Sequence, residues 1–259
     1  MAVNQAGSEK NNMNEIRKQL YDLGVFPGDV VLMHSSMKSL GTKLTPEDFL
    51  HELMDAVTAE GTLLLPALTY ENVTFKKPFF SVSESEPCVG ILPKTFHKME
   101  GVIRSIHPTH SVCAWGKVSK DITVDHINDN SPVGANSPFM QLLKYNGKIL
   151  FVGDILNSCT FMHGIEEIVK APYTLNENMT EYTLKDINGN TYKKDYYTHN
   201  FRGWDQEYFR IRDLLDSPAL RTGNILLSPC TLIDANELKT AAIERFKQDI
   251  YAFVRKTDS

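Results

Sequence analysis

Three short stretches of nearly continuous apolar residues recur along the chain, with helix-like segments between them. The stretches are Val30–Met33, Thr62–Leu65 and Lys148–Val152. A strand that is apolar at successive positions is buried on both faces, as happens when helices cover both sides of a largely parallel sheet. The alternation of strands and helices therefore predicts an α/β protein of three layers, in which helices cover a mixed β-sheet.

The segment after the first strand begins with a clear helix start. Thr45 is a good N-cap, Pro46 suits the first helical position, and Glu47 and Asp48 complement the positive end of the helix. This helix is expected to run to about Ala59.

Apolar spacing predicts the remaining helices, including a terminal one over Leu232–Arg255. Residues 70–90 have the composition of a loop. The stretch 180–200 alternates in polarity and turns at Asn188-Gly189, which predicts a small β-hairpin region towards the C-terminus. The other expected helices are Asn14–Leu23, Gly90–Met99, Phe139–Tyr145 and Cys159–Lys170.

Charge and composition exclude several classes of protein. The 259 residues include 27 Lys and Arg against 32 Asp and Glu, a net charge of −5 without a basic run, which argues against nucleic-acid binding. No stretch reaches the roughly 20 apolar residues of a membrane helix. Residues 1–12 are polar and are expected to be a disordered leader or a cloning remnant, with one domain over 13–259. Four dispersed cysteines without a CxxC motif predict reduced thiols in the cytoplasm.

Polar side chains follow the first buried strand directly. His34, Ser35 and Ser36 come where that strand ends. Ligands of α/β sheets bind at the carboxyl ends of the strands, so these residues and their N–H groups are candidates for holding phosphates or a carbonyl. Helix capping or a turn explains the same residues without a ligand.

A second polar segment spans Arg104–Ser111. It contains one arginine, His107, His110 and three hydroxyl side chains, and Pro108 stiffens it. An arginine donates two parallel hydrogen bonds to a phosphate, so the density of polar groups favours a binding site here over a purely structural corner.

A third segment follows the third strand and enters a helix at about Cys159. His163 and Glu166 are three residues apart, which places both on one face of that helix. A glutamate that accepts a hydrogen bond from one imidazole nitrogen raises the basicity of the other, and this pattern is an acid–base pair. A surface His–Glu pair is the alternative.

Two other mechanisms use the same residues. His107, His110, Asp154 and His163 are potential ligands of a metal-dependent hydrolase, although their spacing matches no strong metal motif. Cys159 lies four residues before His163, as a nucleophile and its base can, yet a cysteine at such a turn is also simply small and apolar.

Five ordered blocks together resemble the aminoglycoside 3-N-acetyltransferase (antibiotic N-acetyltransferase) family. The resemblance runs from about Leu23 to Pro172, with a weaker tail to about residue 248, and residues 174–210 align with nothing. The blocks are Leu23-Gly24-Val25…Pro27-Gly28-Asp29…His34-Ser35-Ser36…Leu40-Gly41, Gly61-Thr62-Leu63…Pro66, Arg104-Ser105-x-His107-Pro108-x-His110-Ser111, Ser131-Pro132-x-Gly134-x-x-Ser137-Pro138 and Thr160-x-x-His163-x-x-Glu166.

The resemblance implies transfer of an acetyl group from acetyl-coenzyme A to an amine, without a metal. It implies that His163 and Glu166 carry the acid–base chemistry, with Thr160 near the thioester. It also implies a coenzyme pocket lined by His34, Ser35, Ser36, Arg104 and Ser111.

The expected acceptor is a small-molecule amine, an aminoglycoside or a similar amino sugar, and a homodimer is compatible with the family. Another amine, a metal-dependent hydrolase and a member that only binds ligand stay open as alternatives. The groups expected to bind the acceptor are His110 and carboxylates near the predicted loops, namely Glu71, Asp154, Asp205 and Glu207.

Overall fold

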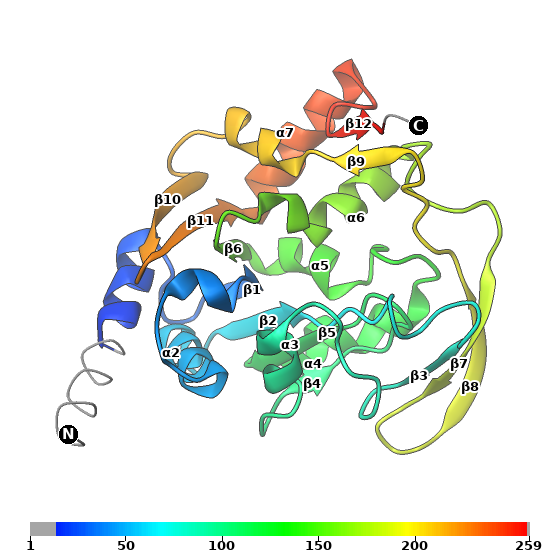
Figure 1. Ribbon diagram of the computed structural model, residues 1–259, viewed down its shortest axis with the longest axis horizontal. Coiled ribbons are helices and arrows are strands. Elements are labelled where there is room, and N and C mark those ends of the chain that lie inside the picture. Colours follow the sequence, from blue (N-terminus) through cyan, green and yellow to red (C-terminus); the bar gives the residue numbers. More distant parts are fainter. Residues whose placement is uncertain (1–13, 258–259) are drawn as a thin grey trace.

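A seven-stranded mixed sheet forms the centre of the protein, seen here in a computed structural model that describes residues 14–257 (Figure 1). The strand order is β10-β11-β6-β1-β2-β5-β4. The three stretches expected as buried strands lie side by side as β6, β1 and β2, all parallel. The strands of this sheet are β1 (Val30–Ser35), β2 (Thr62–Pro66), β4 (Ile103–Arg104), β5 (Val112–Gly116), β6 (Lys148–Val152), β10 (Leu220–Ile225) and β11 (Ser228–Asp234).

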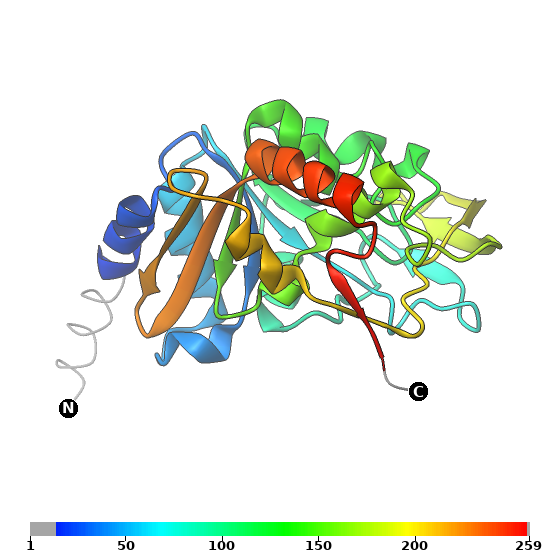
Figure 2. The same cartoon turned by 90° about the horizontal axis from the view of Figure 1, so that it is seen from above.

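Alternate residues of the central strands enter two separate cores, one on each face of the sheet. Val31 and Met33 face one core, and Val30 and Leu32 face the other. Helices cover both faces, as Figure 2 shows, so the expected three-layer α/β arrangement is confirmed. The helix over residues 14–23, α2 (Pro46–Val57) and α3 (Ile91–Phe96) pack on the first core.

The second core lies under the remaining helices and contains mainly aromatic and branched aliphatic side chains. Gly164 brings α6 close to α5, because a Cβ there would collide with Met140 Sδ. The helices of this face are α4 (Ser119–Val124), α5 (Pro138–Gln141), α6 (Thr160–Val169) and α7 (Ala235–Gln248). Short 3-10 helices are η1 (Met37–Leu40), η2 (Asp125–Asn128), η3 (Leu142–Tyr145), η4 (Leu156–Ser158) and η5 (Tyr208–Asp213).

The predicted hairpin is present and belongs to a small sheet at one side of the molecule, at the right of Figure 1. Its strands β7 (Thr180–Lys185) and β8 (Thr191–Tyr196) pair antiparallel. Residues 70–90 are mainly loop, as expected, and their one strand, β3 (Phe79–Ser81), pairs with the distant strand β7 in the register Phe79 with Thr183 onward. A further two-stranded sheet joins β9 (Trp204–Gln206) to β12 (Val254–Lys256).

The prediction of one terminal helix over Leu232–Arg255 is also wrong. Leu232 and Ile233 belong to β11, opposite Leu150 and Ile149 of β6. The helix α7 starts only after Asp234, whose side chain accepts hydrogen bonds from the N–H groups of the first turn. A paired sheet position outweighs helical spacing at this boundary.

The segment 1–12 and Met13 lie outside the described residues, so the expected leader stays a prediction. Over residues 14–257, no helix has the length and apolar character needed to cross a membrane.

Candidate active site

A cavity of about 1120 Å³ opens at the carboxyl ends of the three parallel strands β1, β2 and β6. Side chains from the strand ends and from the start of α6 form its floor. The loop with Tyr70 and Phe75 forms one wall, and the segments 176–182 and 198–201 next to the hairpin form another. This position agrees with the expectation that ligands of α/β sheets bind beyond the strand ends.

His163 and Glu166 form the hydrogen-bonded pair predicted from their spacing. His163 Nδ1 lies 3.0 Å from Glu166 Oε2, and the Glu166 side chain is fully buried. A carboxylate only accepts hydrogen bonds, so Nδ1 carries the proton and donates it. The Nε2 lone pair is therefore available, and His163 lines the cavity.

Two tyrosines complete the surroundings of Glu166. The hydroxyl of Tyr208 lies 2.8 Å from His163 Nδ1 and donates to Glu166 Oε1 at 2.9 Å. The hydroxyl of Tyr173 donates to the same oxygen at 3.2 Å. Burial and the nearby carboxylate raise the pKa of both phenols, so both remain donors at neutral pH. Neither tyrosine has a sequence spacing that relates it to His163.

Thr160 lies at the first position of α6 and lines the same cavity. Within residues 14–257 its hydroxyl makes one long hydrogen bond, to Ser158 O at 3.5 Å. The N–H groups in the first turn of a helix have no partners one turn earlier, and the N-cap Cys159 provides no side-chain hydrogen bond to them, although Met162 N–H donates to Cys159 O at 3.0 Å. The start of α6 thus offers donors next to His163.

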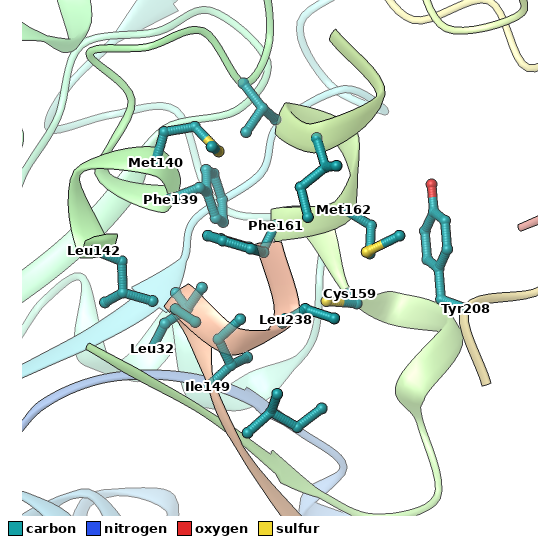
Figure 3. Close-up of a cluster of buried hydrophobic side chains, with 14 of the residues drawn as sticks. Leu32, Phe139, Met140, Leu142, Ile149, Cys159, Phe161, Met162, Tyr208 and Leu238 are labelled. Atoms are coloured by element: carbon teal, nitrogen blue, oxygen red, sulfur yellow. The ribbon is translucent and has the colours of Figure 1, made fainter. Parts of the chain in front are cut away.

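Cys159 is buried in the apolar core beside Met162 and Leu238, as Figure 3 shows. Burial raises the pKa of its thiol to about 12. A thiol in this state is a poor nucleophile.

The polar residues at the carboxyl end of β1, two within the strand and one just after it, divide into two groups. His34 and Ser35 line the cavity, whereas Ser36 is not among its lining residues and donates its backbone N–H to Val152 O. His34 stacks on Phe151, and burial lowers its pKa to about 3, so its imidazole is neutral.

Arg104 and Ser111, expected in the coenzyme pocket, lie away from the cavity lining. Arg104 donates from Nε to Ser111 Oγ at 2.9 Å and from its terminal nitrogens to the carbonyl oxygens of Ala67, Val82 and Ser85. Burial lowers its pKa only to about 10, so the side chain stays charged. The guanidinium therefore connects three loops by hydrogen bonds. It has no pair of parallel N–H groups left to donate to a phosphate.

The expected acceptor-binding carboxylates also lie elsewhere. Asp154 pairs with Arg212, Asp205 pairs with Arg255 at 3.2 Å, and Glu71 is an exposed residue outside the lining. Glu207, the fourth expected carboxylate, pairs with Arg210. His110 does line the cavity, but the lining carboxylate is Glu177, in the segment for which the family blocks had no counterpart.

Five histidine rings form a continuous row from the interior to the cavity. The order is His126, His107, His110, His199 and His163, with ring centroids 4.9, 6.0, 4.6 and 4.5 Å apart. Burial lowers the pKa of the first four. The rings of these four histidines are therefore neutral at pH 7.

The row gives no metal-binding geometry. His107 Nδ1 accepts the N–H groups of Thr109 and His110, and its Nε2 donates to Ser131 O, so both ring nitrogens have partners within the protein. Over residues 14–257 no three or more His, Cys, Asp or Glu side chains gather as metal ligands.

The buried ring of His126 predicts a loss of stability in acid. Its pKa is about 3 in the folded protein against 6.5 when exposed, so the unfolded chain binds more protons between these values. The contribution of the neutral ring to the free energy of unfolding is complete above pH 6.5. It declines below that pH and is smaller by about 2 kcal/mol at pH 5. Urea unfolding at pH 7 and pH 5 measures how much stability is lost between the two pH values. In His126→Gln this loss should be smaller than in the wild type by about 2 kcal/mol. Equal losses in both proteins would contradict the assignment.

The chain is similar to known acetyltransferases over most of its length. A sequence model described as aminoglycoside 3-N-acetyltransferase matches residues 32–247. Aminoglycoside N(3)-acetyltransferase IX of Micromonospora chalcea is 27% identical over 258 residues, covering 89% of this chain and 91% of the relative. Aminoglycoside N(3)-acetyltransferase IV of a Salmonella species is 30% identical over 168 residues, 64% of this chain and 62% of the relative.

Solved structures share the fold. A histidine-to-alanine mutant of aminoglycoside acetyltransferase AAC(3)-IVa in complex with a gentamicin is 25% identical, with a TM-score of 0.78 over 93% of this chain and 90% of that one. A binary complex of AAC-IIIb with CoASH is 23% identical, with a TM-score of 0.79 over 95% of this chain and 98% of that one.

Proposed function

The chain belongs to the aminoglycoside 3-N-acetyltransferase family, and from this membership we propose that it transfers the acetyl group of acetyl-coenzyme A to an amine of an aminoglycoside. The observation that carries the proposal is the buried Glu166 carboxylate, which holds His163 Nδ1 at 3.0 Å and leaves the other nitrogen free at the cavity. The complexes of related proteins with CoASH and with a gentamicin agree with these two ligands.

His163 is the general base of the proposed reaction. Attack of the amine on the thioester forms the N–C bond and breaks the C–S bond. His163 accepts a proton from the attacking nitrogen and returns it to the departing thiolate, while Glu166 stabilises the imidazolium. The N–H groups at the start of α6 and the Thr160 hydroxyl stabilise the negative charge that develops on the carbonyl oxygen.

The acetyl group passes directly to the amine in a ternary complex. The alternative, an acetyl-enzyme on Cys159, needs a thiolate, and the pKa of about 12 opposes its formation. The free cysteines and the thioester substrate agree with the reducing cytoplasm as the place of the reaction. A homodimer stays a prediction, which light scattering tests.

The acceptor binds at the wall of the cavity that carries Glu177. This carboxylate attracts the ammonium groups of the acceptor, and the amides and hydroxyls that line the cavity bind the sugar hydroxyls of the acceptor. His34 and Ser35 bind polar groups of the coenzyme. The amide and hydroxyl side chains on this wall are Asn176, Asn178, Thr180, Tyr182, Thr198 and Asn200.

A thiol-release assay with acetyl-coenzyme A and a panel of aminoglycosides, gentamicin and sisomicin among them, tests the proposal. We expect turnover with at least one of them, and mass spectrometry should show one added acetyl group. Absence of turnover with every amine would overturn the activity.

A second acceptor class is favoured by the charge of the lining. Glu177 is the only lining residue with a carboxylate, and no lysine or arginine lines the cavity within residues 14–257. One carboxylate suits an amino sugar with a single ammonium group better than a polycation. Glucosamine therefore belongs in the panel, and its preferential turnover would replace the antibiotic as the substrate.

Tyr208 is expected to position the base. Tyr208→Phe removes hydrogen bonds to His163 and Glu166, and kcat should fall about tenfold, the worth of one hydrogen bond to a charged group. Tyr173→Phe is the matched control, because it removes only a longer bond to the same carboxylate. The assay is kcat from thiol release at saturating substrates. An equal or larger loss in the control would assign the effect to Glu166 alone.

A further inference from the structure

A second imidazole–carboxylate pair lies beside the first at the cavity. The ring of His199 is 4.5 Å from that of His163, centroid to centroid, and both line the cavity. Its Nε2 is buried, has no hydrogen-bond partner among residues 14–257, and lies 3.9 Å from Oε1 of Glu167. Glu166 and Glu167 are consecutive on α6, so one helix turn supports two histidines from different parts of the chain.

The surroundings hold both members of this pair in place. Glu167 accepts hydrogen bonds from Ser131 Oγ at 2.5 Å and from Val133 N–H at 2.9 Å. The backbone at His199 is held by Asn176, whose Nδ2 donates to His199 O at 3.1 Å. At 3.9 Å from Nε2, the Glu167 carboxylate is close enough to form an ion pair with a protonated His199.

The chemistry of the proposed reaction requires two protons to leave the acceptor nitrogen. An alkylamine at neutral pH is an ammonium ion, with three protons on nitrogen, and the amide product keeps one of them. One departing proton ends on the sulfur of coenzyme A, and the other ends in solvent. A single imidazole holds only one of these protons at a time.

We propose that His199, supported by Glu167, accepts the first proton from the ammonium ion and so produces the nucleophilic amine inside the cavity. His163 then accepts the second proton during attack and delivers it to the thiolate. His199 releases its proton to solvent through the cavity, since 12% of its side-chain surface is exposed. This inference rests on the proposed acetyl transfer and adds to it the protonation state in which the acceptor binds.

The groups around His199 keep its lone pair available. His110 and His107 approach it from the loop before β5, and His163 and Glu167 approach it from α6. Burial and the neighbouring imidazoles lower the pKa of His199. The ring is therefore neutral when the ammonium ion arrives, and the Glu167 carboxylate, 3.9 Å from Nε2, stabilises the imidazolium that forms when the proton is accepted.

His199→Gln tests the assignment, because glutamine keeps hydrogen-bonding capacity but does not take up a proton. With gentamicin or glucosamine, whichever the wild type acetylates, kcat/KM should fall about 10²-fold at pH 7. The variant should then depend on free amine, so its kcat/KM should rise about tenfold per pH unit until the amine itself is neutral, where it approaches wild type. Glu167→Gln should show the same slope with a smaller loss at pH 7.

His110→Gln is the control, since His110 lines the same cavity and contacts the His199 ring. Any loss in that variant should be the same at every pH. A loss in His199→Gln that does not change with pH, or no loss at pH 7, would overturn the role of His199 and leave the acetyl transfer intact. An inactive wild type would instead refute the proposed function, whereas a His163→Ala variant with the kcat of the wild type would refute only the assignment of His163 as the base. Circular dichroism checks that each variant is folded.

Discussion

Replacing His163 by alanine is expected to lower kcat about 10²–10⁴-fold on an acceptor that the wild type acetylates, the usual worth of a positioned general base. The fully buried Glu166 holds one ring nitrogen, and no other imidazole among residues 14–257 makes a hydrogen bond to that carboxylate. The measurement is thiol release at saturating acetyl-coenzyme A. The KM for acetyl-coenzyme A should change less than kcat, because the lost contact acts on the proton of the amine.

Two further variants separate this mechanism from its rivals. Glu166→Gln should cost less than His163→Ala, since an amide keeps the shape of the carboxylate but weakens the base. Cys159→Ser should keep most of the activity, whereas a covalent route through sulfur would lose nearly all of it. Should His163→Ala keep the kcat of the wild type, the base is misassigned, and His110 is the next candidate.

Arg104→Met is expected to reduce the free energy of unfolding by about 3 kcal/mol, because it removes charge-assisted hydrogen bonds to buried acceptors. The guanidinium bonds to Ser111 Oγ and to the carbonyl oxygens of Ala67, Val82 and Ser85. Of these acceptors, Ser85 O has no other hydrogen bond within residues 14–257. Urea unfolding at pH 7 measures the change.

The same variant decides whether Arg104 holds the coenzyme. The side chain does not line the cavity, so the Kd of coenzyme A for the folded variant should stay within about twofold of the wild-type value. A twofold change in Kd corresponds to much less binding free energy than one hydrogen bond contributes. Ser111→Ala is the control and should cost about 1 kcal/mol of stability. A tenfold weaker Kd with unchanged stability would restore the coenzyme-binding role that the family blocks implied.

Local sequence patterns predict those parts of the fold whose physical cause is local. The apolar runs of β1, β2 and β6 record burial on both faces, and the alternation of their side chains between two cores follows from strand geometry. The N-cap Thr45 and the turn at Asn188-Gly189 likewise depend on neighbouring residues alone. Leu232 shows the limit, because pairing with a distant strand decides its conformation.

The residues of the candidate site also differ in whether local sequence spacing or the tertiary fold determines their contacts. His163 and Glu166 are recognisable from the sequence because a helix places residues three apart on one face. Arg104 is recognisable as an unusual residue, yet its role depends on Ala67, Val82 and Ser85, which reach it only in the folded chain. The sequence therefore singles out Arg104, but its hydrogen-bond partners are visible only in the folded chain.

Short-range spacing and ordered blocks were enough to predict the layered α/β architecture, the family and the His163–Glu166 pair. Three other features became visible only in the folded chain: Tyr208 contacts this pair, Glu177 is the carboxylate of the cavity, and His199 stands beside His163. These contacts join residues from separate segments, as far apart as 45 positions for His163 and Tyr208. No periodicity spans such separations, and only the tertiary fold brings His199 and Tyr208 into contact with side chains of α6.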